Sequence, residues 1–117
     1  MRRVLLVTAL LLAGCTRAVD LQGAAISREE SLLRVLIGPN AQRPKLAYLR
    51  LLPCGGSDKQ AYYVGLGDVQ FGATTDLSLL PEDLSRLAPP GRLCAQVFDQ
   101  STPLIRYTSN VVRVVEH

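Results

Sequence analysis

Short runs of apolar and β-branched residues alternate with glycine- and proline-containing turns along most of the chain. Runs of about four to eight residues with such flanks are typical of β-strands, whereas amphipathic helices need longer stretches with a helical period. The run 111–115, Val-Val-Arg-Val-Val, is one of the clearest strand patterns. Strands are predicted at 45–52, 60–66, 76–80, 92–98, 104–107 and 111–115.

The segment 45–52 is apolar on both faces, with Arg50 as the exception, and this predicts a strand in the middle of a sheet. Pro53 ends this strand, and a Gly-Gly pair supplies a flexible turn before the strand at 60–66. The two strands are therefore predicted to form a hairpin.

The segment 27–37 has two interpretations. Ser27, followed three residues later by Glu30, has the pattern of a helix-capping box. The apolar run 32–37, which a Gly-Pro pair closes, fits a buried strand equally well. We favour the strand.

One short helix is predicted at 81–87, where a proline and two acidic residues occupy the first turn. The Pro-Pro-Gly sequence at 89–91 must end it. A succession of short strands with one helical turn predicts a mainly β fold, namely an antiparallel β-sandwich.

Two segments near the C-terminus carry a resemblance to known domains. The segments 91–98 (GRLCAQVF) and 107–114 (YTSNVVRV) resemble the last two strands of fibronectin type III and immunoglobulin-like domains. The resemblance implies a sandwich in which these two strands are neighbours. The region from 91 to 115 that carries it is about a quarter of the mature chain, and the tryptophan typical of both families is missing, since the sequence contains none.

The first residues form an export signal. Arg2 and Arg3 precede an apolar run over 4–14 that ends in small residues, which is the order of regions in a signal peptide. A membrane-spanning helix needs about 20 apolar residues. This run is shorter, and Arg17 and Asp20 follow it at once. The segment is therefore predicted to be a helical signal peptide and not a permanent membrane span.

The sequence Leu12-Ala13-Gly14-Cys15 resembles the lipobox of bacterial lipoproteins. The resemblance implies that the Cys15 thiol receives a diacylglyceryl group and that cleavage makes Cys15 the first mature residue, acylated again on its amine. Thr16 after the cysteine implies transport to the outer membrane. Two or three acyl chains, at about 0.8 kcal/mol per buried CH₂, would hold the mature chain on a membrane.

These patterns divide the chain into a signal peptide (1–14), a lipidated cysteine with a short tether (15–26) and a single β-rich domain (27–117). The tether is expected to run into a first extended segment with Val19 and Leu21 among its apolar positions. The mature chain is long enough for one core and too short for two ordinary domains. The predicted location is the cell envelope, on the outer membrane with the domain in the periplasm.

Two cysteines remain once Cys15 is lipidated. Disulfides persist in the oxidising compartments outside the cytoplasm, so Cys54 and Cys94 are predicted to form a bridge. The alternatives are two free buried thiols, or redox or metal chemistry. The wide separation of the two cysteines lacks the Cys-x-x-Cys spacing that such chemistry usually uses.

No catalytic constellation is present in the sequence pattern. The single histidine, His117, is the last residue, where an active site is hard to build. The acidic residues are scattered or adjacent, as in Glu29-Glu30 and Glu82-Asp83, which is typical of first helical turns and solvated loops. We therefore predict no enzyme activity, no metal site and no cofactor.

The charge balance does not favour a nucleic-acid-binding function. The chain has 13 basic and 10 acidic residues, and two of the basic ones belong to the signal peptide. Nucleic-acid binding depends on clustered Lys and Arg side chains that neutralise phosphates. The expected partners are therefore the membrane, through the lipid anchor, and another envelope protein.

Four tyrosines, Tyr48, Tyr62, Tyr63 and Tyr107, lie on predicted strands. They could line a recognition surface, because tyrosine offers a large contact area at little entropic cost. Core or cross-strand packing is the favoured interpretation. Arg50 and Arg113, each inside an apolar strand, are predicted to snorkel or to pair at a sheet edge.

The function predicted first is therefore that of a non-catalytic envelope module that binds another envelope or secretion component. The stretch 39–44 leading to Leu49-Arg50-Leu51 resembles the segment before an early strand in the type VI secretion lipoproteins, which are β-sandwiches. The alternative is a small periplasmic inhibitor, similar in size and anchoring to the lysozyme inhibitors, although their Ser-Gly-x-x-Tyr loop is missing.

Overall fold

Most of the residues that the computed structural model describes, 15–100 and 105–117, lie in short β-strands, which confirms the mainly β prediction. Two helical turns, η1 (Asp58–Gln60) and α2 (Pro81–Leu84), lie between strands. Within these ranges no helix is long and apolar enough to cross a membrane. The strands are β1 (Cys15–Val19), β2 (Leu21–Ser27), β3 (Leu32–Ile37), β4 (Tyr48–Pro53), β5 (Tyr62–Gly65), β6 (Ala73–Ser78), β7 (Leu93–Gln100), β8 (Ile105–Ser109), β9 (Val112–Arg113) and β10 (Val115–Glu116).

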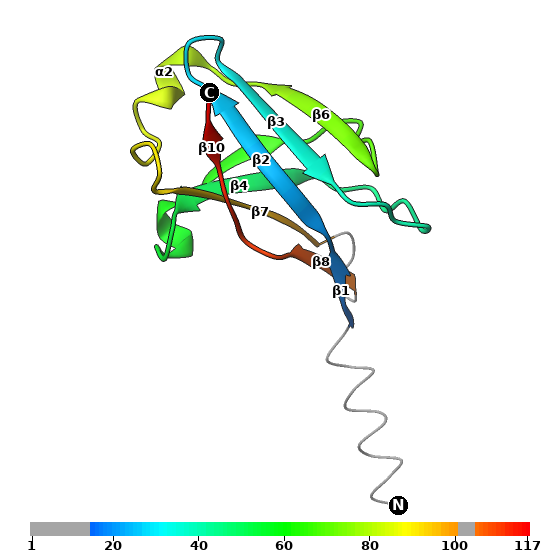
Figure 1. Cartoon of the computed structure of the whole chain (residues 1–117). Helices are drawn as coiled ribbons and strands as arrows, with labels where there is room; N and C mark the ends of the chain where they lie inside the picture. The colour runs from blue at the N-terminus through cyan, green and yellow to red at the C-terminus, as the bar shows by residue number, and fades with distance from the viewer. Residues whose placement is uncertain (1–14, 101–104) are drawn as a thin grey trace, which may run out of the picture.

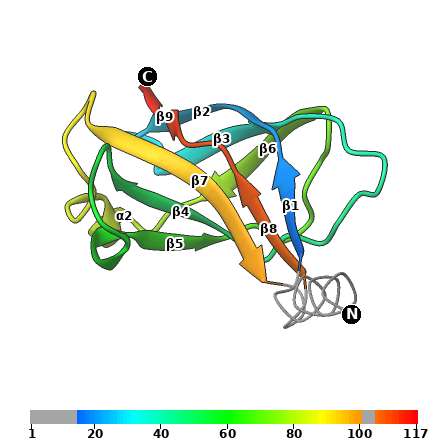
Figure 2. The ribbon, with the colours of Figure 1, turned by 90° about the horizontal axis from the view of Figure 1, so that it is seen from below.

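The strands form two sheets that lie as layers over each other (Figures 1 and 2). The large sheet has the order β1-β8-β7-β4-β5, and β9 also pairs with β7. The small sheet has the order β10-β2-β3-β6. The predicted hairpin between 45–52 and 60–66 is present as the antiparallel pair β4 and β5.

Both sheets are mixed, so the prediction of a purely antiparallel sandwich is wrong. β1 pairs in parallel with β8 at one edge of the large sheet, and β10 pairs in parallel with β2 at one edge of the small sheet. The reason is that the first and last segments of the chain each pass from the large sheet to the small sheet. Because both segments run in the same direction, they can pair only in parallel.

The Asn110 side chain joins the first and last segments by hydrogen bonds where they pass between the sheets. Its Nδ2 donates to the Leu21 carbonyl oxygen at 2.9 Å, and its Oδ1 accepts from the Leu21 amide at 3.0 Å. One side chain thus satisfies both backbone groups of a buried residue, as a neighbouring strand would do.

The extended segment predicted within 15–26 is present, and it begins at Cys15, so these residues do not form a free tether ahead of it. The backbone of these residues forms β1 and most of β2, and both strands are paired within the sheets. Val19 and Leu21 are buried, and Ile26 is fully buried in the same core. The described domain therefore begins at Cys15.

The segment 27–37 is a turn followed by β3, and the favoured strand interpretation is confirmed. Ser27 Oγ does accept from the Glu30 amide, at 3.3 Å, as in a capping box. The chain nevertheless turns back instead of starting a helix, and Ser31 has a φ of 54°. Alternate residues Leu33, Val35 and Ile37 then enter the core.

The core lies between the two sheets, and each sheet contributes large side chains that are almost completely buried. From the small sheet these are Leu21, Ile26, Leu33, Val35 and Ile37, and from the large sheet Leu49, Leu51, Leu93 and Val97.

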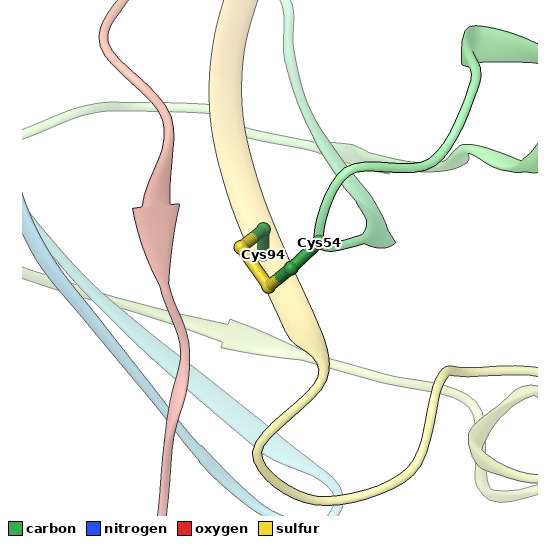
Figure 3. Close-up of a disulfide and its surroundings, with 2 residues drawn as sticks. All are labelled: Cys54 and Cys94. Carbon is green, nitrogen blue, oxygen red and sulfur yellow. A yellow bond between two sulfur atoms is a disulfide. The ribbon is translucent and has the colours of Figure 1, made fainter.

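The predicted Cys54–Cys94 disulfide is present (Figure 3). Cys54 follows β4 directly, and Cys94 lies in β7, the antiparallel neighbour of β4. The two Cα atoms are 5.0 Å apart, within the normal range for a disulfide. The bond therefore lies within the large sheet and joins the β4–β5 turn to β7.

Candidate binding face

The outward surface of the large sheet gathers aromatic and arginine side chains. Side chains alternate between the two faces of a strand. Because Leu49 and Val97 enter the core, their neighbours in β4 and β7 point away from it. The outward side chains that make up the aromatic–arginine face are Tyr48, Arg50, Tyr63, Phe98 and Arg106.

The three rings of this face are in contact. The ring centroids of Tyr48 and Tyr63 are 5.3 Å apart and meet edge to face at 88°, while Tyr48 and Phe98 are 6.3 Å apart and tilted by 38°. Edge-to-face and tilted pairs at such distances are favourable arrangements for aromatic quadrupoles. Tyr48 is therefore the centre of a continuous aromatic strip across β5, β4 and β7.

Two guanidinium groups lie over one of these rings. Arg50 Cζ is 5.0 Å and Arg106 Cζ is 5.7 Å from the centroid of Phe98, within the range of a cation–π interaction. Arg50 is also held by Gln96, whose Oε1 accepts from Arg50 Nη2 at 2.7 Å. Gln96 Nε2 in turn donates to the Ser109 carbonyl at 2.9 Å. The position of Arg50 is therefore fixed by hydrogen bonds that involve both β7 and β8.

The two outer faces of the molecule differ in charge. On the outward positions of β4, β5, β7, β8 and β9 that the structure describes, every charged residue is an arginine: Arg50, Arg106 and Arg113. On the small sheet, Arg34 pairs with Asp76 through bonds of 2.7 and 3.0 Å. These hydrogen bonds hold the pKa of Asp76 below its usual value, and the two charges cancel.

The four tyrosines divide into two pairs. Tyr62 and Tyr107 pack against the core, as predicted. The Tyr62 hydroxyl donates to an Asp83 carboxylate oxygen at 2.5 Å, and this bond raises the pKa of Tyr62. Tyr48 and Tyr63 pack across strands as predicted, but on the outer face, where Tyr63 keeps 51% of its surface exposed.

Two members of the face were not indicated by the sequence pattern. Phe98 and Arg106 belong to the face only because β7 lies between β4 and β8. No local sequence motif indicates that these strands are neighbours. Arg50 was expected to snorkel or to pair at a sheet edge. It lies instead in a central strand, between β5 and β7, and pairs there with Gln96. Arg113 lies exposed on β9.

Two hollows lie elsewhere on the described surface. An open hollow of about 560 Å³ is lined by Arg43, Lys45, Asp68 and Phe71, among others. His117 lines a second hollow beside Glu29 and Glu30, and its backbone amide bonds the Ile26 carbonyl at 2.9 Å. Among residues 15–100 and 105–117, no group of three or more His, Cys, Asp or Glu side chains is placed to hold a metal ion.

The predicted lipidation site stands at the start of the described chain. The signal peptide 1–14, with the lipobox residues Leu12, Ala13 and Gly14, lies outside the described residues. Cys15 is the first residue of β1, and its backbone pairs with Ile105 in β8. The C-terminus lies at the opposite end of the domain from the start of β1 (Figure 1).

Comparison with known proteins adds no further guide to the site. No family model, no curated protein and no solved structure matches this chain. The aromatic–arginine face and its surroundings are therefore the basis for the function proposed below.

Proposed function

We propose that this protein is a non-catalytic binding module, anchored by lipid in the bacterial cell envelope, and that the aromatic–arginine face binds another envelope protein. The observation that carries the proposal is the contact of three rings and two guanidinium groups on one outer sheet face. Aromatic and arginine side chains are the types most enriched at the energetic centres of protein interfaces.

The fixed geometry of the face supports a binding role. Arg50 is held by both Gln96 and Phe98, and Tyr48 is packed between two rings. Binding costs less entropy when the contacting side chains are already ordered, so such a face is prepared for a partner.

The anchor belongs to the same proposal. The lipobox at Leu12–Cys15 implies acyl chains on Cys15 and an outer-membrane location with the domain in the periplasm. Because β1 pairs with β8 from Cys15 onwards, the mature domain would start at the lipid with no free chain between them. Two or more acyl chains on a single cysteine are enough to attach a protein stably to a membrane.

For the fold, we propose membership of the fibronectin-like group of sandwiches. If β4 is the third strand of such a domain, β7 and β8 take the places of its last two strands, and β4, β7 and β8 are neighbours in one sheet, as in that group. The immunoglobulin disulfide joins the two sheets, whereas the Cys54–Cys94 bond lies within one sheet. The fibronectin-like arrangement is therefore favoured over the immunoglobulin-like one.

Charge reversal on the face tests the binding role. We expect the tagged wild-type chain to retain a particular envelope protein from detergent-solubilised envelopes of its host, and Arg106→Glu to reduce that recovery at least tenfold. Arg106 is exposed, so its replacement should leave the fold intact. The matched control is Arg92→Glu, the same change at an exposed position between α2 and β7.

The readout is quantitative mass spectrometry of the retained proteins, with circular dichroism to show that each variant is folded. Equal recovery of the same proteins by the wild type, Arg106→Glu and Arg92→Glu would contradict the proposal.

A further inference from the structure

The aromatic–arginine face lies close to the first residue of the described chain. In the large sheet, Thr16 of β1 is opposite Arg106 of β8, so Arg106 is one strand away from the strand that Cys15 begins. Figure 2 shows the starts of β1 and β8 and the end of β7 together at one end of the sheet. Arg106 is therefore the member of the face nearest to the predicted lipid.

The aromatic residues lie only a little further along the strands. Ala18 is opposite Thr108, and Thr108 is opposite Phe98, whose ring contacts Tyr48. Ala18 follows Cys15 by three positions, which is about 10 Å along a strand. β7 lies two strands from β1, roughly another 10 Å across the sheet. With acyl chains on Cys15, the face would lie beside the membrane surface.

The pairing of β1 leaves the domain little freedom to change this placement. The backbone of β1 pairs with β8 from Cys15 to Val19, and Val19 is buried in the core. A lipidated Cys15 would therefore be joined directly to folded sheet, and the domain could not extend away from the membrane on a flexible segment. A partner of the face must come within reach of the membrane surface.

The charge at this end of the face indicates what the partner presents. Arg106 is exposed, and its Cζ atom lies 5.7 Å from the centroid of the Phe98 ring. Within the described residues, no salt bridge engages Arg106. Arginine binds carboxylates with two parallel hydrogen bonds in favourable geometries. A protein surface with carboxylates at the height of Arg106 therefore complements the face.

We infer that the partner is a protein held in the outer membrane itself, and that its surface next to the lipid headgroups presents carboxylates to Arg106. This inference rests on the proposed function, including the lipid anchor. Two proteins that are confined to one membrane meet at a higher effective concentration than two proteins in free solution, which strengthens binding through a small face.

The placement of the face is tested with the purified lipoprotein in vesicles that contain dansyl-phosphatidylethanolamine. The sequence contains no tryptophan, so Phe98→Trp supplies a single energy donor on the face. Val115→Trp is the matched donor, because Val115 is exposed in β10, near the C-terminus and at the opposite end of the domain from β1 (Figure 1). Energy transfer falls steeply with distance, so we expect at least threefold more transfer from position 98 than from position 115. Equal transfer from both positions would overturn the inference.

The membrane that holds the partner is tested by moving the anchor. A benzoyl-phenylalanine replaces Tyr63 in the full chain, and either Asp or Ser is inserted between Cys15 and Thr16. The resemblance to lipoproteins implies that Asp directly after the cysteine retains the chain in the inner membrane, whereas Ser leaves it in the outer membrane. Because the domain has no tether, we expect the Asp insertion to lower the yield of the protein photo-adduct at least tenfold. The Ser insertion should keep the yield within twofold, and density-gradient separation of the membranes verifies where each chain resides.

A second pair of variants in the same cross-linking chain tests the contact with carboxylates. Arg106→Lys keeps the positive charge, whereas Arg106→Gln removes it. We expect Arg106→Gln to lower the adduct yield at least fivefold and Arg106→Lys to retain more than half of it. Equal yields from the two variants would contradict the contact between Arg106 and carboxylates.

Equal adduct yields from the Asp and Ser insertions would overturn the inference, because the partner would then reach the face from solution. The proposed function would stand in that case. An adduct with phospholipid in place of a protein would also overturn the inference, since the face would then meet the membrane itself. The absence of any protein adduct from the chain without an insertion would contradict the proposed function.

Discussion

Reduction of the Cys54–Cys94 disulfide is expected to lower the free energy of unfolding by about 4 kcal/mol. The bond closes a loop with a sequence separation of 40 residues, and the loss of chain entropy in the unfolded state gives about this value. Domains of this kind are stable by only about 5 to 15 kcal/mol. The disulfide therefore contributes a large share of the stability of the sheet that carries the aromatic–arginine face.

Urea unfolding followed by circular dichroism, with and without reductant, measures this effect. The double variant Cys54→Ser with Cys94→Ser is the control, and it should unfold at the midpoint of the reduced protein and show no response to reductant. An unchanged midpoint on reduction of the wild type would contradict the expectation.

Replacement of Cys15 by alanine is expected to abolish lipid attachment completely, because only a thiol can form the thioether to the diacylglyceryl group. The wild-type protein from a membrane fraction should have the intact mass of residues 15–117 plus acyl chains. No species with that acyl mass should exist for Cys15→Ala. The double variant at Cys54 and Cys94 should remain lipidated, since neither cysteine belongs to the lipobox.

Intact-mass spectrometry of the membrane and soluble fractions decides between the outcomes. A wild-type product without acyl mass in the soluble fraction would make the protein a free periplasmic one. That result would contradict the proposed lipid anchor but not the proposed binding role of the aromatic–arginine face.

The strands that the sequence predicts best are those whose burial produces a recognisable pattern of apolar residues along the chain. Leu33, Val35 and Ile37 alternate with more exposed residues in β3, and the two-sided apolar pattern of 45–52 corresponds to the central strand β4. Such patterns depend only on neighbours along the chain, so they can be read before any pairing is known.

The edges of the sheets could not be predicted in the same way. β1 pairs with β8 and β10 pairs with β2, and each pair joins opposite ends of the chain. Such pairs follow from the crossing of the first and last segments between the sheets. In residues 15–20 the charged positions Arg17 and Asp20 interrupt any regular alternation, which is why this part of 15–26 has the appearance of a tether.

The aromatic–arginine face was predictable in part. Tyr48 and Tyr63 stand out as aromatic residues on strands, but the side of the sheet that each one faces depends on register. A shift of one residue moves every side chain of a strand to the other face. Phe98 and Arg106 become members of the face only through the register of β7 with its neighbours β4 and β8.

Photo-crosslinking in intact cells tests the binding role of the face most directly. A benzoyl-phenylalanine replaces Tyr63 on the face, and in a matched variant it replaces Thr74, an exposed outward residue of β6 in the small sheet. After irradiation, we expect one dominant covalent adduct with an envelope protein from position 63 and none from position 74. No adduct from position 63, or the same adduct from both positions, would contradict the assignment of this face as the binding site.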